Sequence, residues 1–302
     1  MKKKIIAKIS EGLGNQLFMY ANSYSLSKTY NLDYYIDNLS GYYQSKHIQK
    51  FQLDRFQLSA QKASNEYIFD NFYKNLYKKI LIFFDIFYKN KKFFFETKQT
   101  NKLTHYSPLD LTNTHDFFFL DGNFESEKYF LDYRDDLLKE FVIKNSENFL
   151  ENKYLDIIKK SNVVSICVRQ NRFSERIGNK FSSIALNKSF LFVEKTIDYI
   201  NKAVKYFDKN VNNPKYLIWS NNFDNLEKYF DTKKFTFVIN NNDKVLTDFY
   251  LLTQCKYFIV GPSTFHWWGA WLSNFDDKIC VRPKDLNPSN NKNFWPDKWL
   301  II

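Results

Sequence analysis

Three of the chain's six arginines stand close together, directly after a run of apolar residues from Val163 to Val168. Arginine offers a planar, bidentate fork that fits phosphate oxygens, whereas lysine presents a point charge. Lysine supplies most of the cations in this chain, so an arginine cluster departs from the surrounding composition. The cluster predicts a diphosphate-binding site, with surface ion pairs to Glu175 and Asp198 as the alternative. Its members are Arg169, Arg172 and Arg176.

A second candidate anion site lies between Val260 and Trp271. An apolar run ends at Val260, and the Gly261-Pro262 pair that follows predicts a turn. Serine at the next position is a favourable N-cap for a helix. The free N–H groups at the start of such a helix, together with its dipole, would bind an anion. The alternative is an ordinary strand, turn and helix whose tryptophans fill the core. The predicted donors are the N–H groups of Ser263, Thr264 and Phe265.

A third candidate is the glycine-containing segment that follows the first apolar run. Two of the seven glycines, Gly12 and Gly14, lie here, and glycine lets a ligand approach the backbone closely. The dinucleotide-binding pattern G-x-G-x-x-G is absent, because Leu17 stands at the position of its third glycine. This disfavours a dinucleotide cofactor. The segment predicts a tight loop that contacts the ligand. The predicted contacts are Gly14, Asn15 and Gln16, and Glu11 is the nearest acid in sequence.

The elements that position these groups follow from hydrophobic periodicity. Apolar runs alternate regularly with helical patterns in the second half of the chain, which predicts a parallel sheet covered by helices on both faces. The expected strands are 163–168, 216–220, 235–239, 257–260 and 278–282, and the expected helices 188–207, 222–230, 243–254 and 263–273. Ligands bind such sheets at the carboxyl ends of the strands, where Ser220 and Asn221 also lie.

The first half predicts a smaller unit of the same kind, with a strand over 4–9, a helix over 17–30 and strands over 34–37 and 117–121. A junction near residue 150 divides the chain into domains 1–150 and 151–302. Within the first domain, apolar residues at helical spacing predict a helix over 65–92 flanked by lysines. This helix either packs on the body of the protein or forms a surface for a lipid-linked or membrane-borne partner.

Composition excludes several classes of protein. A content of 44% hydrophobic and 25% charged residues indicates a globular chain. The net charge of +11, from 44 basic and 33 acidic residues, is spread along the chain, so nucleic-acid binding is disfavoured. Three cysteines exclude a disulfide scaffold, and no metal-ligand spacing or D-x-D triplet occurs. No apolar segment is long enough to cross a membrane, and we expect an intracellular protein.

These motifs resemble those of the α-1,2-fucosyltransferases of glycosyltransferase family 11. The glycine segment 12–21, GLGNQLFMYA, is similar to the family's G-L-G-N-Q-M/L-F-x-Y-A start. The segments 126–130, SEKYF, and 263–272, STFHWWGAWL, resemble its Q-S-E-K-Y-F and S-S-F-S-W-W-G/A-A-W-L motifs. The segments 248–252, DFYLL, and 295–299, WPDKW, match in kind. The matches run in order from residue 10 to 299.

The resemblance implies an α/β, GT-B-like fold, in which two Rossmann-like domains face a central cleft. It implies inverting transfer of fucose from GDP-fucose, without a cofactor or metal ion, to a sugar hydroxyl, often the 2-hydroxyl of galactose. The acceptor would be an oligosaccharide or lipid-linked glycan in bacterial O-antigen or capsule synthesis. The enzyme would act at the cytoplasmic side, with possible peripheral membrane association. The family's H-x-R-R-G-D motif is altered here to 167–172, CVRQNR.

The implied roles follow residue by residue. Arg169 would bind the β-phosphate, completed by the N–H groups that open the tryptophan-rich helix. Asn15 and Gln16 would reach the donor's phosphate or sugar, and Ser220 and Asn221 its guanine or ribose. Glu11 is the candidate general base, with a surface carboxylate as the alternative. The altered motif leaves open another sugar nucleotide on the same scaffold, or an inactive glycan-binding or scaffold protein.

Overall fold

The structure is a computed structural model that describes residues 3–43, 50–85, 87, 91–96, 104–112, 115–175, 182–241, 243–289 and 291–302. It contains two compact units. The first comprises Met1–Val142 with Ser289–Pro296, and the second comprises Ile143–Pro288 with Asp297–Ile302. We predicted a division between residues 150 and 151; the units divide between Val142 and Ile143, and a late segment of the chain is part of the first unit.

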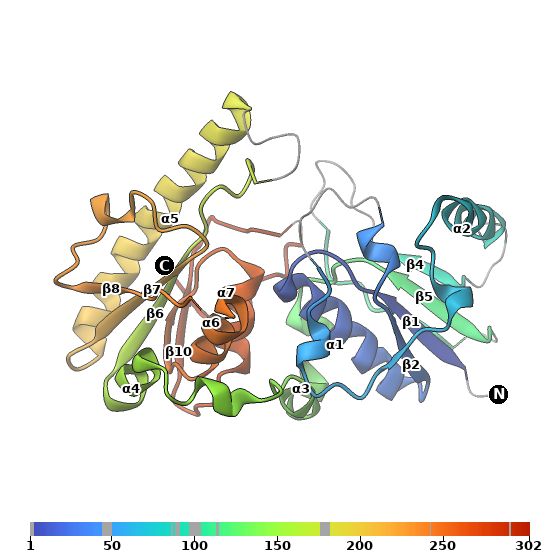
Figure 1. Ribbon diagram of the computed structural model, residues 1–302, viewed down its shortest axis with the longest axis horizontal. Helices are drawn as coiled ribbons and strands as arrows, with labels where there is room; N and C mark the ends of the chain where they lie inside the picture. Colours follow the sequence, from blue (N-terminus) through green and yellow to red (C-terminus); the bar gives the residue numbers. More distant parts are fainter. Residues whose placement is uncertain are drawn as a thin grey trace. The chain divides into compact units, whose positions relative to one another are not determined.

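The first unit is a parallel sheet in the order β3-β2-β1-β5-β4 (Figure 1). Helix α1 covers one face, where Leu26 packs with Ile5 and Phe118. Helix α2 lies on the other face, where its Leu81 and Ile82 pack against the sheet. The elements are β1 Lys4–Lys8, α1 Leu13–Thr29, β2 Asp33–Asp37, β3 Gln61–Lys62, α2 Phe72–Asp85, β4 Phe93–Phe95, β5 Phe117–Asp121 and α3 Arg134–Glu140, with 3-10 turns at Ser40–Tyr42, Leu53–Arg55, Asn65–Tyr67, Glu127–Tyr129 and Leu131–Tyr133.

The second unit is a six-stranded parallel sheet in the order β11-β10-β9-β6-β7-β8. Counted within this unit, that is the 3-2-1-4-5-6 order of Rossmann folds read in reverse. The elements are α4 Lys153–Lys160, β6 Val163–Val168, α5 Ser183–Asn210, β7 Lys215–Ser220, β8 Phe235–Phe237, α6 Lys244–Thr253, β9 Tyr257–Ile259, α7 Thr264–Leu272, β10 Ile279–Arg282 and β11 Leu300–Ile301, with 3-10 turns at Ser146–Phe149 and Leu226–Lys228.

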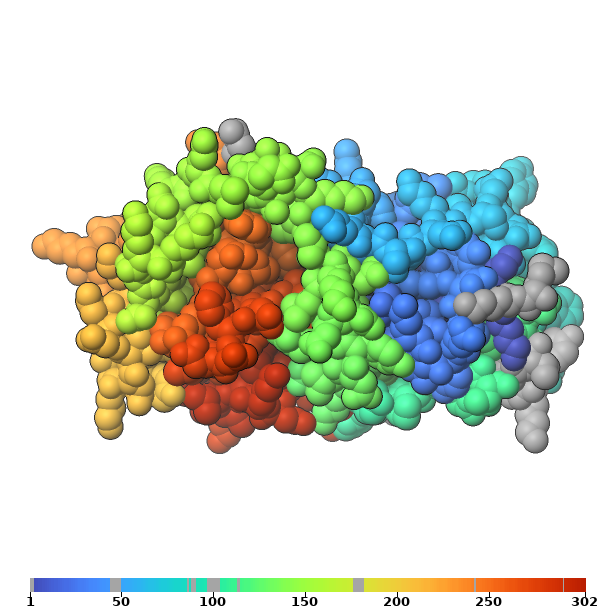
Figure 2. Space-filling view, turned by 90° about the horizontal axis from the view of Figure 1, so that it is seen from below, coloured from blue at the N-terminus to red at the C-terminus, as the bar shows by residue number. Residues whose placement is uncertain are grey.

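Helices cover both faces of this second sheet. Helix α5 packs its stripe of Val193, Ile197 and Phe207 on one face. Helices α6 and α7 pack together on the other, and Figure 2 shows their orange atoms beside the yellow-green atoms of α4. The tryptophans of α7 belong to the core, because Trp267 and Trp268 are fully buried and the Trp267 ring stacks on Trp271.

Several element boundaries differ from the predicted ones. Helix α1 begins at Leu13, because Gly12 takes the extended conformation of an N-cap, so the glycine motif opens a helix and is not a loop. The helix predicted over 222–230 is only a 3-10 turn at Leu226–Lys228. Helix α2 is shorter than the predicted 65–92, and parts of that range (86 and 88–90) lie outside the described residues.

Candidate functional site

The candidate donor site of the second unit lies where the strand order reverses. Strand β6 pairs in parallel with β7 on one side and β9 on the other, so the segments that follow these three strands emerge at one edge of the sheet. Ligands of open α/β sheets bind at such a reversal. Arg169 follows β6 directly, and Gly261 and Ser263 follow β9.

The turn after β9 is pressed against the end of β6 at Gly261. A Cβ atom at this position would come within 2.1 Å of the Cys167 carbonyl oxygen, which a side chain cannot do without moving the backbone. The Gly261 N–H donates a hydrogen bond to Nδ1 of His266 at 2.9 Å. Glycine therefore allows the start of α7 to lie against the strand that carries Arg169.

The buried His266 side chain stabilises this turn through its bond to Gly261. Its ring is fully buried, and burial lowers its pKa to about 3, so the imidazole is neutral. Because Nδ1 accepts from Gly261, the ring proton is on Nε2, which lies 3.2 Å from the Ser165 hydroxyl. His266 thus serves as a neutral bridge between the turn and strand β6.

The start of α7 presents the predicted anion-binding N–H groups, with one correction. The Ser263 N–H already donates to the Gly261 carbonyl at 2.7 Å, and the Ser263 side chain makes no capping bond. The first N–H groups of a helix have no partner inside it, and here they belong to Thr264, Phe265 and His266. The anion-binding end is therefore displaced by one residue from the predicted set.

The three predicted arginines do not act as one group. Arg169 is ion-paired with Glu175 at 2.5 Å, with about a quarter of its side chain exposed (28%). Arg172 donates to the Pro288 carbonyl and lies over the Phe192 ring, 5.3 Å from its centroid. Arg176 lies outside the described residues. The ion pair to Glu175 that we considered as the alternative is present, and Arg172 serves to anchor its loop.

The residues predicted after β7 hold loops together. Ser220 is buried and donates to the Val168 carbonyl at 2.9 Å. The Asn221 amide exchanges two hydrogen bonds with the Gln170 backbone, at 2.8 and 3.0 Å. Their polar groups clamp the loop after β6 to the loop after β7, and the contact with a base or ribose stays a prediction.

Two polar residues at this edge were not in the predicted set. Lys244, in the first turn of α6, donates to the Ser220 carbonyl at 3.2 Å. Asp248, one turn later, accepts from Asn240 at 2.7 Å, and burial raises its pKa to about 6. A carboxyl group whose pKa is raised towards neutral pH, near a ligand-binding edge, is typical of functional sites. The signal available in the sequence was the match of the DFYLL segment, which begins at Asp248.

The first unit has its own strand reversal, between β1 and β5. Glu11 follows β1 in the left-handed region (φ 64°), a conformation that costs a non-glycine residue free energy. Its carboxylate accepts from the Asn15 amide and from the Asn123 amide at 3.4 Å. Asn123, which follows β5, was not predicted. The structure thus brings Glu11 and Asn15 together with a third polar group.

Gly14 and Gln16 are both buried in the first unit, at the start of α1. Gly14 is buried in the first turn of α1. The Gln16 side chain is fully buried and donates to the carbonyls of Glu11 and Lys50 while accepting from the Gln52 N–H. This corrects the prediction that Gln16 reaches a donor, because its amide is engaged in holding the loop after β1.

Comparison with known proteins places the whole arrangement in a family. The model of glycosyl transferase family 11 matches residues 4–299. This chain belongs to glycosyl transferase family 11.

Two curated family relatives match over nearly their full lengths. An Alpha-1,2-colitosyltransferase of Escherichia coli is 27% identical over 309 residues, covering 99% of this chain and 98% of that protein. The O-antigen biosynthesis glycosyltransferase WbnK of Escherichia coli is 26% identical over 320 residues, covering 97% and 99%. This family 11 member is therefore a glycosyltransferase.

Among solved structures, a mutant of Arabidopsis thaliana FUT1 in complex with GDP is similar to the family 11 chain, with a TM-score of 0.53 and 13% identity. The match covers 94% of this chain and 71% of that one. Together with the two parallel sheets, this similarity confirms the predicted α/β, GT-B-like fold.

Metal-binding clusters and membrane-spanning helices are both absent from the described part of the family 11 chain. Within the described ranges, no group of three or more histidine, cysteine, aspartate or glutamate side chains is arranged to hold a metal ion. Among the helices that the structure describes, none combines the length and the apolar character that crossing a bilayer requires.

The neutral His266 predicts a pH dependence of stability. The unfolded imidazole takes up a proton near pH 6.5, whereas the folded one resists until about pH 3. The contribution of the neutral His266 to the free energy of unfolding is therefore complete above about pH 6.5. It is lost as the pH falls, at up to about 1.4 kcal/mol per pH unit. His266→Asn keeps an acceptor for the Gly261 N–H but removes the titrating group.

We expect His266→Asn to be less stable than the wild type at pH 7. The difference in free energy of unfolding between the two proteins should shrink by about 2 kcal/mol at pH 5. Urea unfolding at both pH values measures this. A gap that is the same at pH 5 and pH 7 would contradict a neutral, buried imidazole.

Proposed function

We propose that this glycosyltransferase transfers fucose from GDP-fucose to a sugar hydroxyl, with inversion and without a metal ion. The observation that carries the proposal is the juxtaposition of Arg169 with the start of α7 at the strand reversal of the second sheet. A guanidinium group and an unpaired helix N-terminus are hydrogen-bond donors suited to a diphosphate. The family's motifs, present from the first strand to the last, support GDP-fucose as the donor.

In this mechanism the leaving GDP needs its developing negative charge stabilised. Arg169 supplies a bidentate donor once its ion pair with Glu175 gives way to the phosphate, and the N–H groups of Thr264, Phe265 and His266 supply fixed donors. The N–H donors are held in place before the substrate arrives, because Gly261 and His266 fix the start of α7. We assign Lys244 as an additional cation for the nucleotide.

Inversion also needs a base for the acceptor hydroxyl on the opposite face of the sugar. We propose Glu11 for this role. The amides of Asn15 and Asn123 both donate to its carboxylate, which fixes its orientation. The strained backbone at Glu11 is consistent with a position kept for function.

The acceptor we propose is a galactose residue of a surface glycan, modified at its 2-hydroxyl in O-antigen synthesis and presented as an oligosaccharide or a lipid-linked chain. The names of the two Escherichia coli relatives support the linkage and the process, respectively. The colitosyltransferase also favours a second donor candidate, since colitose is fucose without its 3-hydroxyl group. A GDP-linked deoxy sugar is common to both candidates.

The donor proposal is tested with a panel of sugar nucleotides. We expect GDP to raise the melting temperature more than UDP or dTDP, and GDP-fucose to be hydrolysed slowly with EDTA present. GDP-colitose is the matched comparison for the sugar. A preference for UDP or dTDP, or loss of turnover with EDTA, would contradict the proposal. Binding without turnover even when an acceptor is present would indicate an inactive glycan-binding protein.

A conservative change at Arg169 tests the diphosphate contact. We expect Arg169→Lys to weaken GDP binding about tenfold or more, because lysine cannot form the bidentate pair. Isothermal titration calorimetry measures the affinity. Arg172→Lys is the matched control in the same loop and should change GDP affinity little, since that guanidinium binds a carbonyl. Equal losses in both variants would show that loop integrity, and not phosphate contact, is responsible.

The base is tested by comparing two glutamates of the first unit. Glu11→Gln should lower kcat about 100- to 10,000-fold while leaving GDP affinity unchanged, because only proton transfer is removed. Glu125→Gln is the comparison, since Glu125 is buried and accepts from the Ser289 hydroxyl. If Glu125→Gln shows the larger loss of kcat, the base is not Glu11.

A further inference from the structure

Helix α2 directs two charged side chains, Lys78 and Asp85, inward and its aromatic side chains outward. The only residues of this helix that are buried are Lys78 and Asp85. Two further inward residues, Leu81 and Ile82, are partly buried against the sheet. A surface helix normally buries its apolar stripe and exposes its charges, so this orientation is the reverse of the usual one.

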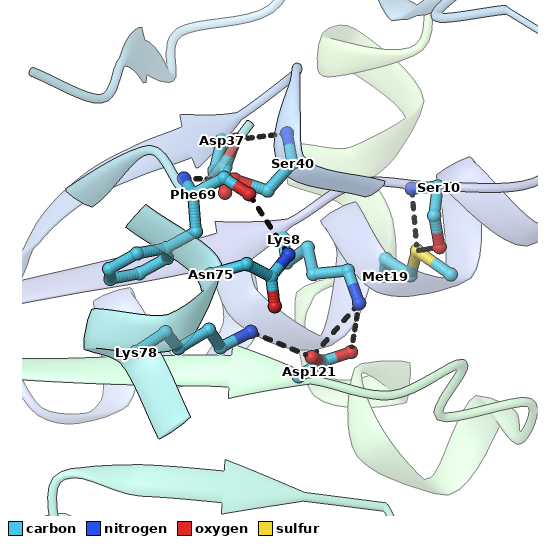
Figure 3. A network of polar contacts seen from close by, with 9 residues as sticks. All are labelled: Lys8, Ser10, Met19, Asp37, Ser40, Phe69, Asn75, Lys78 and Asp121. Atoms are coloured by element: carbon cyan, nitrogen blue, oxygen red, sulfur yellow. Dashed lines mark hydrogen bonds and ion pairs between the residues drawn. The ribbon is translucent and has the colours of Figure 1, made fainter. Parts of the chain in front are cut away.

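An ion-pair cluster around the buried Lys78 fixes this orientation (Figure 3). The Lys78 ammonium lies 3.1 Å from the Asp121 carboxylate at the end of β5, and Lys8 binds the same carboxylate at 2.7 Å. Burial opposes ionisation of Asp121, but the two lysines outweigh it and hold its pKa below the usual value. The Lys78 ammonium also lies over the Phe119 ring, 4.5 Å from its centroid.

The far end of α2 is fixed in the same way. The Asp85 carboxylate accepts hydrogen bonds from the backbone N–H groups of Lys92 and Phe93, at 2.9 to 3.0 Å. Rotating the helix by half a turn would bury its aromatic rings but would leave Lys78 and Asp85 without these partners, and Asp121 with Lys8 alone. A buried charge that loses its partner is strongly destabilising, so the outward aromatic face is held in place.

The outward face is a continuous apolar surface at helical spacing. Its exposure is large at both ends, with Tyr73 at 81% and Phe87 at 74%. Removing such side chains from water is favourable, and this face leaves that gain in free energy unused. We call it the α2 aromatic face. Its members are Phe72, Tyr73, Leu76, Tyr77, Ile80, Phe83, Phe84 and Phe87.

We propose that the α2 aromatic face docks the protein on an anionic lipid bilayer, with the helix lying flat in the headgroup region. Charge complementarity favours this occupant. Residues 70–92 carry six lysines and two aspartates, so 6 − 2 gives a local charge of +4. Anionic headgroups attract such a segment, while aromatic rings, tyrosine included, insert at the boundary of the acyl chains.

A second copy of the chain is a poorer occupant. Pairing two α2 helices would bring the like charges of both segments together. The inference does not depend on which sugar nucleotide the enzyme uses.

Vesicle co-sedimentation tests the proposal. We expect the protein to bind vesicles of equal parts phosphatidylglycerol and phosphatidylcholine, to bind pure phosphatidylcholine weakly, and to be released by high salt. The double variant F83S/F84S should lower vesicle binding at least about tenfold. Its melting temperature should be unchanged, because both rings are 57% exposed.

The matched control is Phe190→Ser, which removes a ring of similar exposure (55%) on α5 of the second unit and should bind vesicles as the wild type does. Equal binding by F83S/F84S and the wild type would overturn the proposal, as would no binding to the anionic vesicles. Light scattering provides the remaining test. A dimer that F83S/F84S abolishes would assign the α2 aromatic face to a second copy and would likewise overturn it.

Discussion

The parallel pairing of β6 with β7 along one side and with β9 along the other is the constraint on which the donor site depends. Because all three strands run in one direction, Arg169, Asn221 and the start of α7 emerge at the same edge of the sheet. The approach is close enough that a Cβ atom at Gly261 would clash with the Cys167 carbonyl, so backbone contact sets the separation between the end of β6 and the turn before α7.

Buried polar side chains then make the loops at this edge rigid. His266 accepts from the Gly261 N–H, Ser220 donates to the Val168 carbonyl, and the Asn221 amide pairs with the Gln170 backbone. In the first unit Gln16 does the same for the loop that carries Glu11. Donors fixed in advance stabilise developing charge without reorganising during the reaction, which is how such sites lower a barrier. In the proposed mechanism these motif residues would serve catalysis by holding the ligand-binding groups in position.

The sequence allowed the inner strands of both sheets to be predicted, because each is a short apolar run. The short edge strands β3, β4 and β11 were not predicted. Strands 163–168 and 117–121 have the predicted bounds. It did not reveal which polar residues would be engaged internally. Arg169 and Arg172 look alike in sequence, and only the fold places Pro288 and the Phe192 ring beside Arg172. Asn123 escaped prediction because its partner Glu11 is more than a hundred residues away.

The outward orientation of the aromatic face of α2 was not predicted either, because it too depends on residues that are distant in sequence. Periodicity shows that the helix has an apolar face, but the direction of that face is decided by Asp121 and Lys8 on distant strands. The apolar spacing of α2 by itself fits a face packed on the protein equally well. A buried ion pair, which contributes little net stability, can nonetheless select one of two orientations.

The altered arginine motif can now be interpreted physically. Where the family usually carries glycine, Asn171 has φ 56°, a left-handed conformation that glycine adopts freely and asparagine tolerates better than most residues. The Asn171 carbonyl accepts from the N–H of Glu175, the residue that pairs with Arg169. The substitution thus preserves the turn that orients the loop.

The replacement of the family's histidine by Cys167 also lies beneath the site. The Cys167 side chain is buried, and burial raises its pKa to about 12, so it stays a neutral thiol that takes no part in proton transfer. Its carbonyl and Cβ contact the position of Gly261, so a change at this residue acts on the packing of the turn before α7. Both substitutions therefore lie among the residues that support the phosphate-binding groups. Arg169 and the N-terminus of α7, which would contact the diphosphate, are retained.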